Sequence, residues 1–398
     1  MITHRDVVDA RQRIATVLRP TPVDHSDSLS RLAGRGVILK PEHLQRTGSF
    51  KIRGAYNHIV QLPPGLEVVA GSAGNHAQGV ALAASLSGRR ATIYMPLNAA
   101  LPKVEATRSY GADVRLMGDV VDDAITAAKD HAACAGAAYV PPFDDPAVIA
   151  GQGTIGLELA EEAPDADVVV VPVGGGGLIA GVATALAYTR RSARVVGVEA
   201  AGAASLTAAL AAGRAVALER LSTMADGIAV RAVSELTLAH ARAYVDDVVT
   251  VDEEEISQAM LLLVERAKAV VEPSGATALA AILAGRIPGN GPAVAVCSGG
   301  NIDPRLLIKL IDYGLSAAGR YLVLRVVMAD RPGALAGLTR EIANLGLNVL
   351  DVEHHRSGLA LGLDQVEVAL TLETRDAAHH EEVIDALRTV GYSVQKVS

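Results

Sequence analysis

The feature that most restricts the fold is a repeated pattern in which a short apolar run precedes a longer, alanine-rich stretch of helical periodicity. The clearest of these runs are Glu67 to Ala70, Ala91 to Met95, Val168 to Val173 and Arg194 to Glu199. Short runs rich in valine and isoleucine are typical of strands buried on both faces, and their alternation with helices predicts an α/β fold with covered parallel sheets. Ligands of such sheets bind at the carboxyl ends of the strands, so the residues directly after each run are candidate site residues.

Length, charge and cysteine content narrow the classes of protein to which the chain can belong. At 398 residues it exceeds the usual size of one domain, so we expect two or three. The net charge of -8 disfavours nucleic acid and anionic membranes as partners. Cys134 and Cys297 lack metal-ligand spacing, which favours a reducing compartment and hence the cytoplasm. Because neither a signal-peptide pattern nor a membrane-spanning apolar run is found, we expect no secretion and no membrane anchor.

The C-terminal part of the chain has a pattern of its own, which begins at Tyr321 after a Ser-Ala-Ala-Gly linker. The order strand, helix, strand, strand, helix, strand is predicted at Tyr321 to Met328, Ala334 to Leu345, Asn348 to Val352, Gln365 to Leu372, Ala377 to Val390 and Tyr392 to Val397. This order is typical of a ferredoxin-like α+β domain. We therefore expect a separate domain at residues 321–398.

The first candidate site is the segment Thr47-Gly48-Ser49-Phe50-Lys51. Ser49 is a favourable N-cap residue and Gly48 permits a tight turn, so we expect Lys51 in the first turn of a helix. The positive end of the helix dipole disfavours an ammonium group there and lowers the pKa of the lysine, and a neutral amine can attack an aldehyde to form a Schiff base. From this segment alone, an ordinary exposed lysine is an equally good interpretation.

The second candidate site is Ser72-Ala73-Gly74-Asn75-His76, directly after the first of the apolar runs. Successive backbone N–H groups at a helix start, together with the Ser72 hydroxyl, can bind a carboxylate such as that of an amino acid. The alternative is a well-capped helix with Asn75 and His76 as polar surface residues. His76 by itself is better explained as structural than as catalytic.

The third candidate site is the run Gly174, Gly175, Gly176, Gly177 and Leu178, which lies between a predicted strand and a predicted helix. Four glycines allow the backbone to wrap a phosphate and to direct several N–H groups and the helix dipole at it. No lysine followed by serine or threonine comes after them, which excludes a nucleotide-hydrolysing P-loop. The alternative is that the glycines only allow tight packing between strand and helix.

A fourth segment, Cys297-Ser298-Gly299-Gly300-Asn301, follows the apolar run Ala293 to Val296. By itself it is better explained as a simple turn at the end of a strand. Its position at a strand end nevertheless places it with the other three segments.

In this order, the four segments resemble the threonine and serine dehydratases of the fold-type II pyridoxal-phosphate family, and they are most similar to the biosynthetic-type threonine ammonia-lyases. The resemblance extends from Thr21 to Tyr313 and includes Pro141-Pro142-Phe143-Asp144, Gly151-Gln152-Gly153-Thr154 and Glu272-Pro273-Ser274-Gly275-Ala276. It implies two open, twisted parallel-sheet domains. We expect a large cofactor-binding domain at 1–46 and 148–316 and a small domain at 47–147.

The resemblance also implies a role for each candidate residue and pyridoxal 5'-phosphate as cofactor. Lys51 would carry the cofactor as a Schiff base and, once released, move the α-proton of the substrate. The remaining cofactor contacts would come from Phe50 at the ring, Asn75 at the ring hydroxyl, Ser298 at the pyridine nitrogen, and Gly174, Gly175, Gly176, Gly177 and Leu178 at the phosphate. The substrate carboxylate would be bound by Ser72, Ala73, Gly74, Asn75 and His76.

A neutral serine at the pyridine nitrogen favours one class of reaction. Ser298 does not promote ring protonation as a carboxylate would, so the cofactor is a weaker electron sink and β-elimination competes well with transamination. The resemblance implies dehydrative deamination of L-threonine to 2-oxobutanoate and ammonia, the committed step towards isoleucine, with serine converted more slowly to pyruvate. Two alternatives are an ammonia-lyase for another 3-hydroxy amino acid, such as serine, 3-hydroxyaspartate or phenylserine, and a catalytically inactive amino-acid sensor.

Two positions depart from related serine racemases. Those relatives have a second serine in the carboxylate loop where this chain has Ala73, so we expect poor racemisation. They also bind a divalent cation through a glutamate and a later aspartate; Glu199 matches the first, but Ser205 stands at the second. We therefore predict no metal site and leave a monovalent ion near Glu199 as an open alternative.

The C-terminal domain resembles an ACT domain, a small-molecule sensor that usually works in pairs. Its matching positions are the turn that contains Asp330, Gly333, Ala334 and Leu335, and Asn348 at the start of the second strand. The resemblance implies control by a branched-chain amino acid such as isoleucine or valine, and a homodimer or homotetramer. The alternative is a dimerisation module that no longer binds a ligand.

Overall fold

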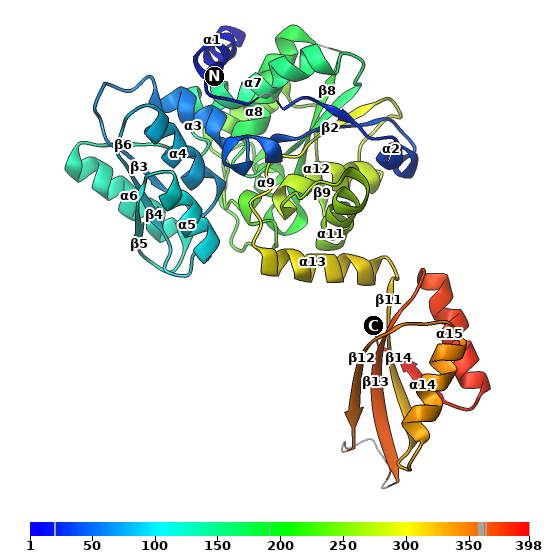
Figure 1. Cartoon of the computed structure of the whole chain (residues 1–398). Helices are drawn as coiled ribbons and strands as arrows, with labels where there is room; N and C mark the ends of the chain where they lie inside the picture. The colour runs from blue at the N-terminus through cyan, green and yellow to red at the C-terminus, as the bar shows by residue number, and fades with distance from the viewer. Residues whose placement is uncertain (20, 191, 357–361, 363, 398) are drawn as a thin grey trace. The chain divides into compact units, whose positions relative to one another are not determined.

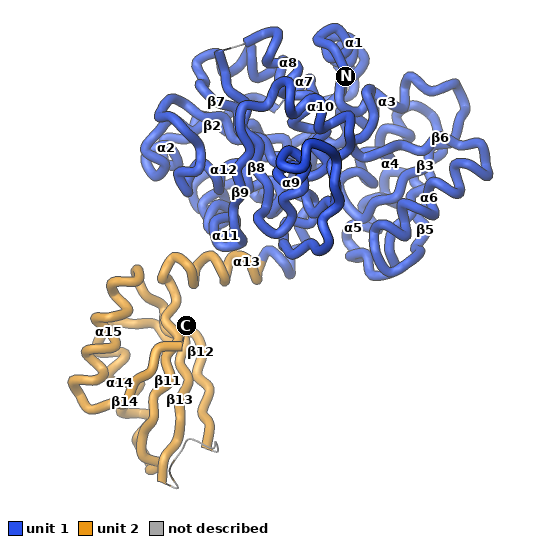
Figure 2. Tube along the Cα trace, turned by 180° about the vertical axis from the view of Figure 1, so that it is seen from behind, with its two compact units in different colours: residues 1–307 blue, residues 308–398 orange. Residues whose placement is uncertain are grey.

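The computed structural model describes residues 1–19, 21–190, 192–356, 362 and 364–397. They form two compact units, residues 1–307 and residues 308–398, which are coloured separately in Figure 2. Within the described ranges, no helix combines the length and the apolar character needed to cross a bilayer.

In the described part of the first unit, the larger of two sheets has six strands in the order β1-β2-β10-β7-β8-β9. Strands β2, β8 and β9 of this sheet are labelled in Figure 1. The strands are β1 (Asp24–His25), β2 (Val37–Lys40), β7 (Val168–Pro172), β8 (Arg194–Ala200), β9 (Asp247–Val251) and β10 (Ala293–Val296). Neighbours pair in parallel, apart from β1, which is antiparallel to β2. Every residue of β7 and β10 is buried, which explains why the sequence of both strands is apolar throughout.

Helices cover both faces of this sheet. Val169 and Val171 of β7 share a core with α7 (Pro146–Glu162) and α8 (Gly177–Thr189). Helix α12 (Pro273–Leu283) packs against β7, β8 and β10 outside that core. Further helical segments of the first unit are α1 (His4–Ile14), α2 (Asp27–Ala33), η1 (Glu42–Leu44), η2 (Arg46–Gly48), η3 (Ala201–Ala203), α9 (Ser205–Ala212), η4 (Asp226–Ile228), α10 (Glu235–Tyr244), α11 (Glu253–Leu262) and η5 (Leu263–Ala267).

The smaller sheet of the first unit, as far as its residues are described, has four parallel strands in the order β5-β4-β3-β6. Its elements are β3 (Val68–Gly71), β4 (Ala91–Met95), β5 (Asp113–Leu116) and β6 (Ala138–Tyr139), with α3 (Lys51–Ile59), α4 (Asn75–Leu86), α5 (Leu101–Ser109) and α6 (Val121–Ala135). Val68 and Ile93 lie in a core with α4, whereas Val69 and Tyr94 pack against α6. The side chains therefore alternate between the two faces, and a helix covers each face.

The second unit is an antiparallel sheet with two helices, and its described strands have the order β12-β13-β11-β14. After α13 (Pro304–Ala317), which contains the boundary between the units, come β11 (Tyr321–Ala329), α14 (Ala334–Asn344), β12 (Val349–His355), β13 (Gln365–Glu373), α15 (Ala377–Thr389) and β14 (Ser393–Lys396). Leucine and valine side chains from β11 and β13 form a core with α14 and α15. The predicted ferredoxin-like order is confirmed.

The predicted parallel α/β fold is also confirmed, and most strands lie within one or two residues of their predicted positions. Strand β4 coincides with its prediction, whereas β12 extends three residues beyond the predicted end at Val352. Almost every residue of β12 is exposed, so the strand has no apolar pattern by which its end could be recognised.

The division of the first unit into a large and a small domain remains a prediction. Strands β3 to β6 fall within residues 47–147, and the strands of the larger sheet fall outside them. The contacts within the chain separate residues 308–398 from the rest, close to the predicted C-terminal domain at 321–398, whose last residue, Ser398, is outside the described residues.

A buried ion-pair network fixes α3 within the first unit. The guanidinium of Arg53 on α3 donates to both carboxylate oxygens of Glu42 at 2.8 and 2.7 Å and to Glu158 of α7 at 2.9 Å. The ammonium of Lys40 lies 2.8 Å from the carboxylate of Glu158. The side chains of Arg53, Glu42 and Lys40 are fully buried, so each charge depends on its partners. The network holds the helix that begins with Lys51.

Replacing Arg53 by methionine is expected to lower the free energy of unfolding by about 3–5 kcal/mol, because the carboxylate of Glu42 would stay buried without its partner. The control is Arg11→Met, which breaks the half-exposed pair with Glu161 and should cost less than about 1 kcal/mol. Urea denaturation of both variants, followed by circular dichroism, measures the difference. Equal losses in the two variants would contradict the role given to the buried network.

Candidate active site

A short backbone pairing joins the lysine segment to the end of β10. Phe50 N donates to Ser298 O at 3.1 Å, and Gly300 N donates to Gly48 O at 2.9 Å. Ser49 and Gly299 form an isolated antiparallel bridge between these two bonds. The pairing places Lys51 beside Ser298, although about 250 residues separate them in the chain.

Lys51 lies in the first turn of α3, as predicted, but the predicted N-cap is wrong. Helix α3 begins at Lys51 and its N-cap residue is Phe50, for which the described residues supply no side-chain capping bond. Ser49 is extended, with φ of -165°, because it takes part in the bridge to Gly299. Its hydroxyl oxygen is buried and has no hydrogen-bond partner among the described residues.

Lys51 is partly buried, and its side chain lines a cavity. Its amine donates to the backbone oxygen of Pro142 at 3.1 Å and lies 5.2 Å from the ring centre of Phe50. Burial lowers the pKa of Lys51 to about 8, and the charge of Glu272 opposes part of this shift. The lowered pKa was predicted from the helix dipole, whereas in the structure its main cause is desolvation.

The predicted cofactor and substrate residues surround a single cavity of about 720 Å³ in the first unit. This volume is typical of pockets for small molecules. Its lining includes Phe50, Lys51, Ser72, Ala73, Gly74, Asn75, His76, Gly174, Gly175, Gly176, Gly177, Leu178 and Ser298. The structure thus brings together residues from three strand ends and from the start of α3, while the group that each one binds remains a prediction.

The glycine loop between β7 and α8 has no room for side chains. Gly176 has a φ of 85°, which favours glycine, and a Cβ at Gly175 would overlap the ring of Phe143. Helix α8 begins after Gly176 without a side-chain cap from the described residues, so its first N–H groups are open to an anion. Phe143 belongs to neither β7 nor α8, so this contact does not test the alternative of tight packing between strand and helix.

His76 is a buried, neutral histidine. Its Nε2 lies 2.9 Å from the backbone oxygen of Val140, which can only accept, so Nε2 carries the proton. Burial and the charge of Lys51 lower the pKa of His76 to about 3. Because it stays uncharged at neutral pH, a structural role explains it better than a catalytic one.

Six charged residues of the cavity lining were not among the predicted site residues: Lys103, Asp119, Asp122, Asp226, Arg231 and Glu272. Lys103 of α5 and Asp226 of η4 form an ion pair with a distance of 2.6 Å. Burial and the charge of Asp226 raise the pKa of Glu272 to about 7. The Asp-Gly pair at 226–227 and the Glu-Pro pair at 272–273 are local turn and helix-start signals, but neither indicates a cavity.

The residues present fit one cofactor. A lysine amine with a lowered pKa suits an aldehyde, and the uncapped glycine loop suits a phosphate. The hydroxyl of Ser298 and the amide of Asn75, both at the cavity, supply neutral hydrogen-bonding groups for an aromatic ring with polar substituents. A parallel α/β fold with these groups at the strand ends defines a pyridoxal-phosphate-dependent enzyme.

The chain belongs to the pyridoxal-phosphate dependent enzyme family, whose model matches residues 14–299, and the ACT domain model matches residues 322–391. The L-threonine ammonia-lyase of Thermotoga maritima is 47% identical over 100% of both chains. The L-threonine ammonia-lyase of Geobacter sulfurreducens is 46% identical over 99% of both. The processed form of threonine deaminase isoform 2 from Solanum lycopersicum is similar in structure, with a TM-score of 0.75, 40% identity, and coverage of 78% of this chain and 87% of that one.

The Glu199 carboxylate, which the resemblance had raised as a possible ion ligand, binds a helix start. It accepts hydrogen bonds from Leu206 N at 2.7 Å, from Thr207 N at 2.9 Å and from the Thr207 hydroxyl at 2.7 Å. Its pKa is raised by burial, in part offset by these bonds. The described residues contain no group of three or more histidine, cysteine or acidic side chains placed to hold a metal.

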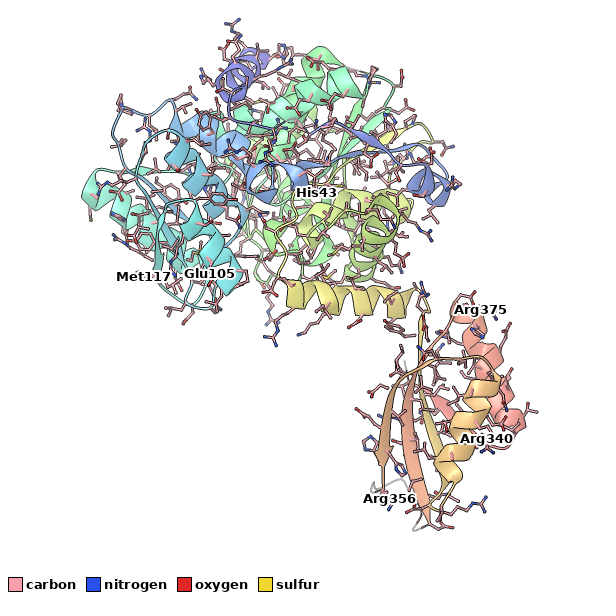
Figure 3. All side chains as sticks on the ribbon, viewed as in Figure 1. His43, Glu105, Met117, Arg340, Arg356 and Arg375 are labelled. Atoms are coloured by element: carbon pink, nitrogen blue, oxygen red, sulfur yellow. The ribbon has the colours of Figure 1, made fainter. Side chains whose placement is uncertain are left out.

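The structure does not bring the predicted effector residues together: the turn that contains Asp330 follows the end of β11 that pairs with Gln365, whereas Asn348 lies at the opposite end of the sheet, beside Glu373. Gly333 has a φ of 86° and precedes the first residue of α14, Ala334. Ala334 and Leu335 pack against the core of this unit, and Asn348 Nδ2 lies 3.4 Å from the Glu373 carboxylate. The Asp330 carboxylate lies 3.4 Å from the guanidinium of Arg356, which is labelled in Figure 3. Their ligand remains a prediction.

The lowered pKa of Lys51 leads to a test by pH. The apoenzyme should take up pyridoxal phosphate at a rate that rises about tenfold per pH unit below 8 and levels above it, because only the neutral amine attacks the aldehyde. An exposed lysine, with an ordinary pKa, would level only near 10.5. Stopped-flow absorbance measures the rate, with Nα-acetyl-lysine as the free-amine control. A rate that keeps rising through pH 9 to 10 would contradict the pKa assigned to Lys51.

Proposed function

We propose that this chain catalyses the dehydrative deamination of L-threonine to 2-oxobutanoate and ammonia, with L-serine as a slower substrate that yields pyruvate. The observation that carries the proposal is the partly buried Lys51 amine, with its pKa lowered to about 8, in the lining of a cavity that also includes the glycine loop and Ser298. The names of the full-length relatives support threonine as the preferred substrate. The committed step towards isoleucine is the role that we assign to this reaction.

Different residues of the cavity bind the cofactor, bind the substrate and transfer the proton. The cofactor supplies an electron-withdrawing ring that acidifies the α-carbon of the bound amino acid. The backbone at the start of α8 binds the phosphate, and the Ser72–His76 loop binds the substrate carboxylate. Lys51 takes the α-proton through its neutral amine, and the β-hydroxyl accepts a proton and leaves as water. The released enamine then reacts with water to give the 2-oxo acid and ammonia.

Because the carboxylate loop has no second base, proton transfer takes place on only one face of the α-carbon. Ala73 has no proton to exchange, and His76 stays neutral with its Nε2 proton bound to the oxygen of Val140. Lys51 therefore acts alone on one face of the α-carbon. This arrangement favours elimination over racemisation.

The second unit provides control by an amino acid. The turn at Asp330, Gly333, Ala334 and Leu335 and, at the opposite end of the sheet, Asn348 are the positions that we assign to binding of isoleucine or valine. An N–H group at the start of α14 can bind the effector's carboxylate, and the Asp330 carboxylate can pair with its ammonium group.

A homodimer or homotetramer in the cytoplasm is the form that we assign to the enzyme. Strand β12 lies at the edge of its sheet and exposes Leu350 and Val352 to 46% and 40%. An exposed apolar edge of this kind favours pairing between copies. Cys134 and Cys297 are both free thiols, which suits a reducing compartment.

Replacing Lys51 by alanine is expected to abolish the visible absorbance of the bound cofactor and to lower ammonia release from threonine at least about a thousandfold, because the base is lost. Lys129→Ala, at an exposed position of α6, is the matched control and should keep both. A substrate panel of threonine, serine, 3-hydroxyaspartate and phenylserine should give the highest kcat/KM for threonine.

Three results would contradict this assignment. Full absorbance and turnover in Lys51→Ala would exclude Lys51 as the base. A higher kcat/KM for 3-hydroxyaspartate or phenylserine would indicate an ammonia-lyase for that amino acid. Cofactor-loaded protein that releases no ammonia from any of the four would indicate an amino-acid sensor.

Isoleucine or valine is expected to shift the threonine saturation curve, and Asp330→Ala or Asn348→Ala should raise the effector concentration needed at least about tenfold, since each removes a bond to a charged ligand. Each variant is compared with its own rate without effector. Arg340→Ala, an exposed position of α14 labelled in Figure 3, is the control and should respond as the unaltered protein does. An unchanged response in both test variants would move the effector site elsewhere.

A further inference from the structure

Three polar side chains form a hydrogen-bonded chain beside the cavity. Asn301 Nδ2 donates to Thr47 O at 2.6 Å and to Asn75 Oδ1 at 2.7 Å, and Asn75 Nδ2 donates to Glu272 Oε1 at 2.6 Å. Asn301 follows β10, Asn75 is the first residue of α4, and Glu272 is the N-cap residue of α12. These hydrogen bonds therefore connect the smaller sheet to the larger one.

The backbone carbonyl at one end determines the direction of every bond in this chain. Thr47 O can only accept, so Asn301 must turn its NH₂ group towards it. The same NH₂ group meets Asn75, whose oxygen must then face Asn301. The NH₂ group of Asn75 therefore faces Glu272, which has to supply an acceptor. These contacts therefore determine which side of the Asn75 amide carries the oxygen and which carries the nitrogen.

Contacts with neighbouring residues fix the position of Glu272, the acceptor for the NH₂ group of Asn75. Its side chain lies in the buried lining of the cavity, with 3% of the residue exposed, and its backbone N donates to Gly299 O at 3.0 Å. A Cβ at Gly299 would overlap the carboxylate, so the carboxylate occupies the space that a side chain there would need. Pro273 at the next position fixes the start of α12.

Glu272 accepts a hydrogen bond in both of its protonation states. Asp226 and burial favour its neutral form, while Lys103 and the bond from Asn75 favour the carboxylate. Lys51 is a further charged neighbour. A neutral carboxyl group still accepts through its carbonyl oxygen, and a carboxylate accepts through either oxygen. The bond from Asn75 is retained in both forms.

We propose that Glu272 is a positioning residue: it takes one N–H of Asn75 and so commits the other N–H of that amide to the ring hydroxyl oxygen of the cofactor. The inference rests on the role proposed for Asn75 at the ring. An amide nitrogen carries two hydrogens, and in the described structure Glu272 binds one of them. Without the Glu272 acceptor, only the bond from Asn301 still restrains the Asn75 amide, and neither of its two N–H groups has a fixed protein partner.

The test is a double-mutant cycle on cofactor affinity. Glu272→Leu removes the acceptor with little change in volume and should raise the dissociation constant of pyridoxal phosphate about tenfold. In an Asn75→Ala background the same change should raise it less than about twofold, because Glu272 acts through Asn75. Equilibrium dialysis gives the dissociation constants. The visible absorbance maximum of the bound cofactor should shift in each single variant, without a further shift in the double variant.

Glu272→Gln is the conservative control. Its amide oxygen still accepts from Asn75, so both cofactor affinity and absorbance should stay close to those of the unaltered protein. Asn301→Leu tests the chain from its other end: it removes the donor to the Asn75 oxygen and should again raise the dissociation constant only where Asn75 is present. This variant decides the question if Glu272→Leu does not fold, as judged by circular dichroism.

Two outcomes would overturn the inference. A loss of affinity in Glu272→Leu that is equally large with and without Asn75, or a Glu272→Gln variant as weak as Glu272→Leu, would show that Glu272 does not act through the Asn75 amide. An unchanged dissociation constant in Asn75→Ala alone would instead remove the role of Asn75 at the ring. The reaction proposed for the protein is tested separately, by the turnover of Lys51→Ala.

Discussion

The backbone pairing between residues 48–50 and 298–300 is the constraint on which the active site depends. It consists of main-chain bonds alone, from Phe50 to Ser298 and from Gly300 to Gly48. These bonds set where α3 begins, and the buried network around Arg53 holds the rest of that helix. The lysine and the serine at the cavity are therefore placed relative to each other by rigid elements, before any ligand is bound.

Burial, more than any local charge, sets the protonation of the groups around this pairing. Desolvation disfavours the charged form of every group, so it lowers the pKa values of Lys51 and His76 and raises that of Glu272. A single physical cause thus makes the lysine a usable base at neutral pH and leaves the histidine uncharged. The charges of Asp226 and Lys103, which pair with each other, act on Glu272 in opposite directions.

How well each element could be predicted follows from its exposure and from the range of its contacts. Buried strands such as β7 are continuous apolar runs and were recognised, whereas the exposed β12 was given too short an extent. Ser49 has the composition of an N-cap, but a partner far along the chain holds it extended. Local propensity was overruled there by a tertiary contact.

The sequence by itself determined the α/β class, the ferredoxin-like C-terminal unit and the four glycine-rich or polar segments, because local composition and periodicity indicate each of them. Only the tertiary structure decided that these segments share one cavity with Glu272, Lys103 and Asp226. It also decided that desolvation lowers the pKa of Lys51 and that the Asn75 amide has a fixed orientation. Desolvation and hydrogen-bond direction depend on residues brought together from distant parts of the chain, and local patterns contain no record of them.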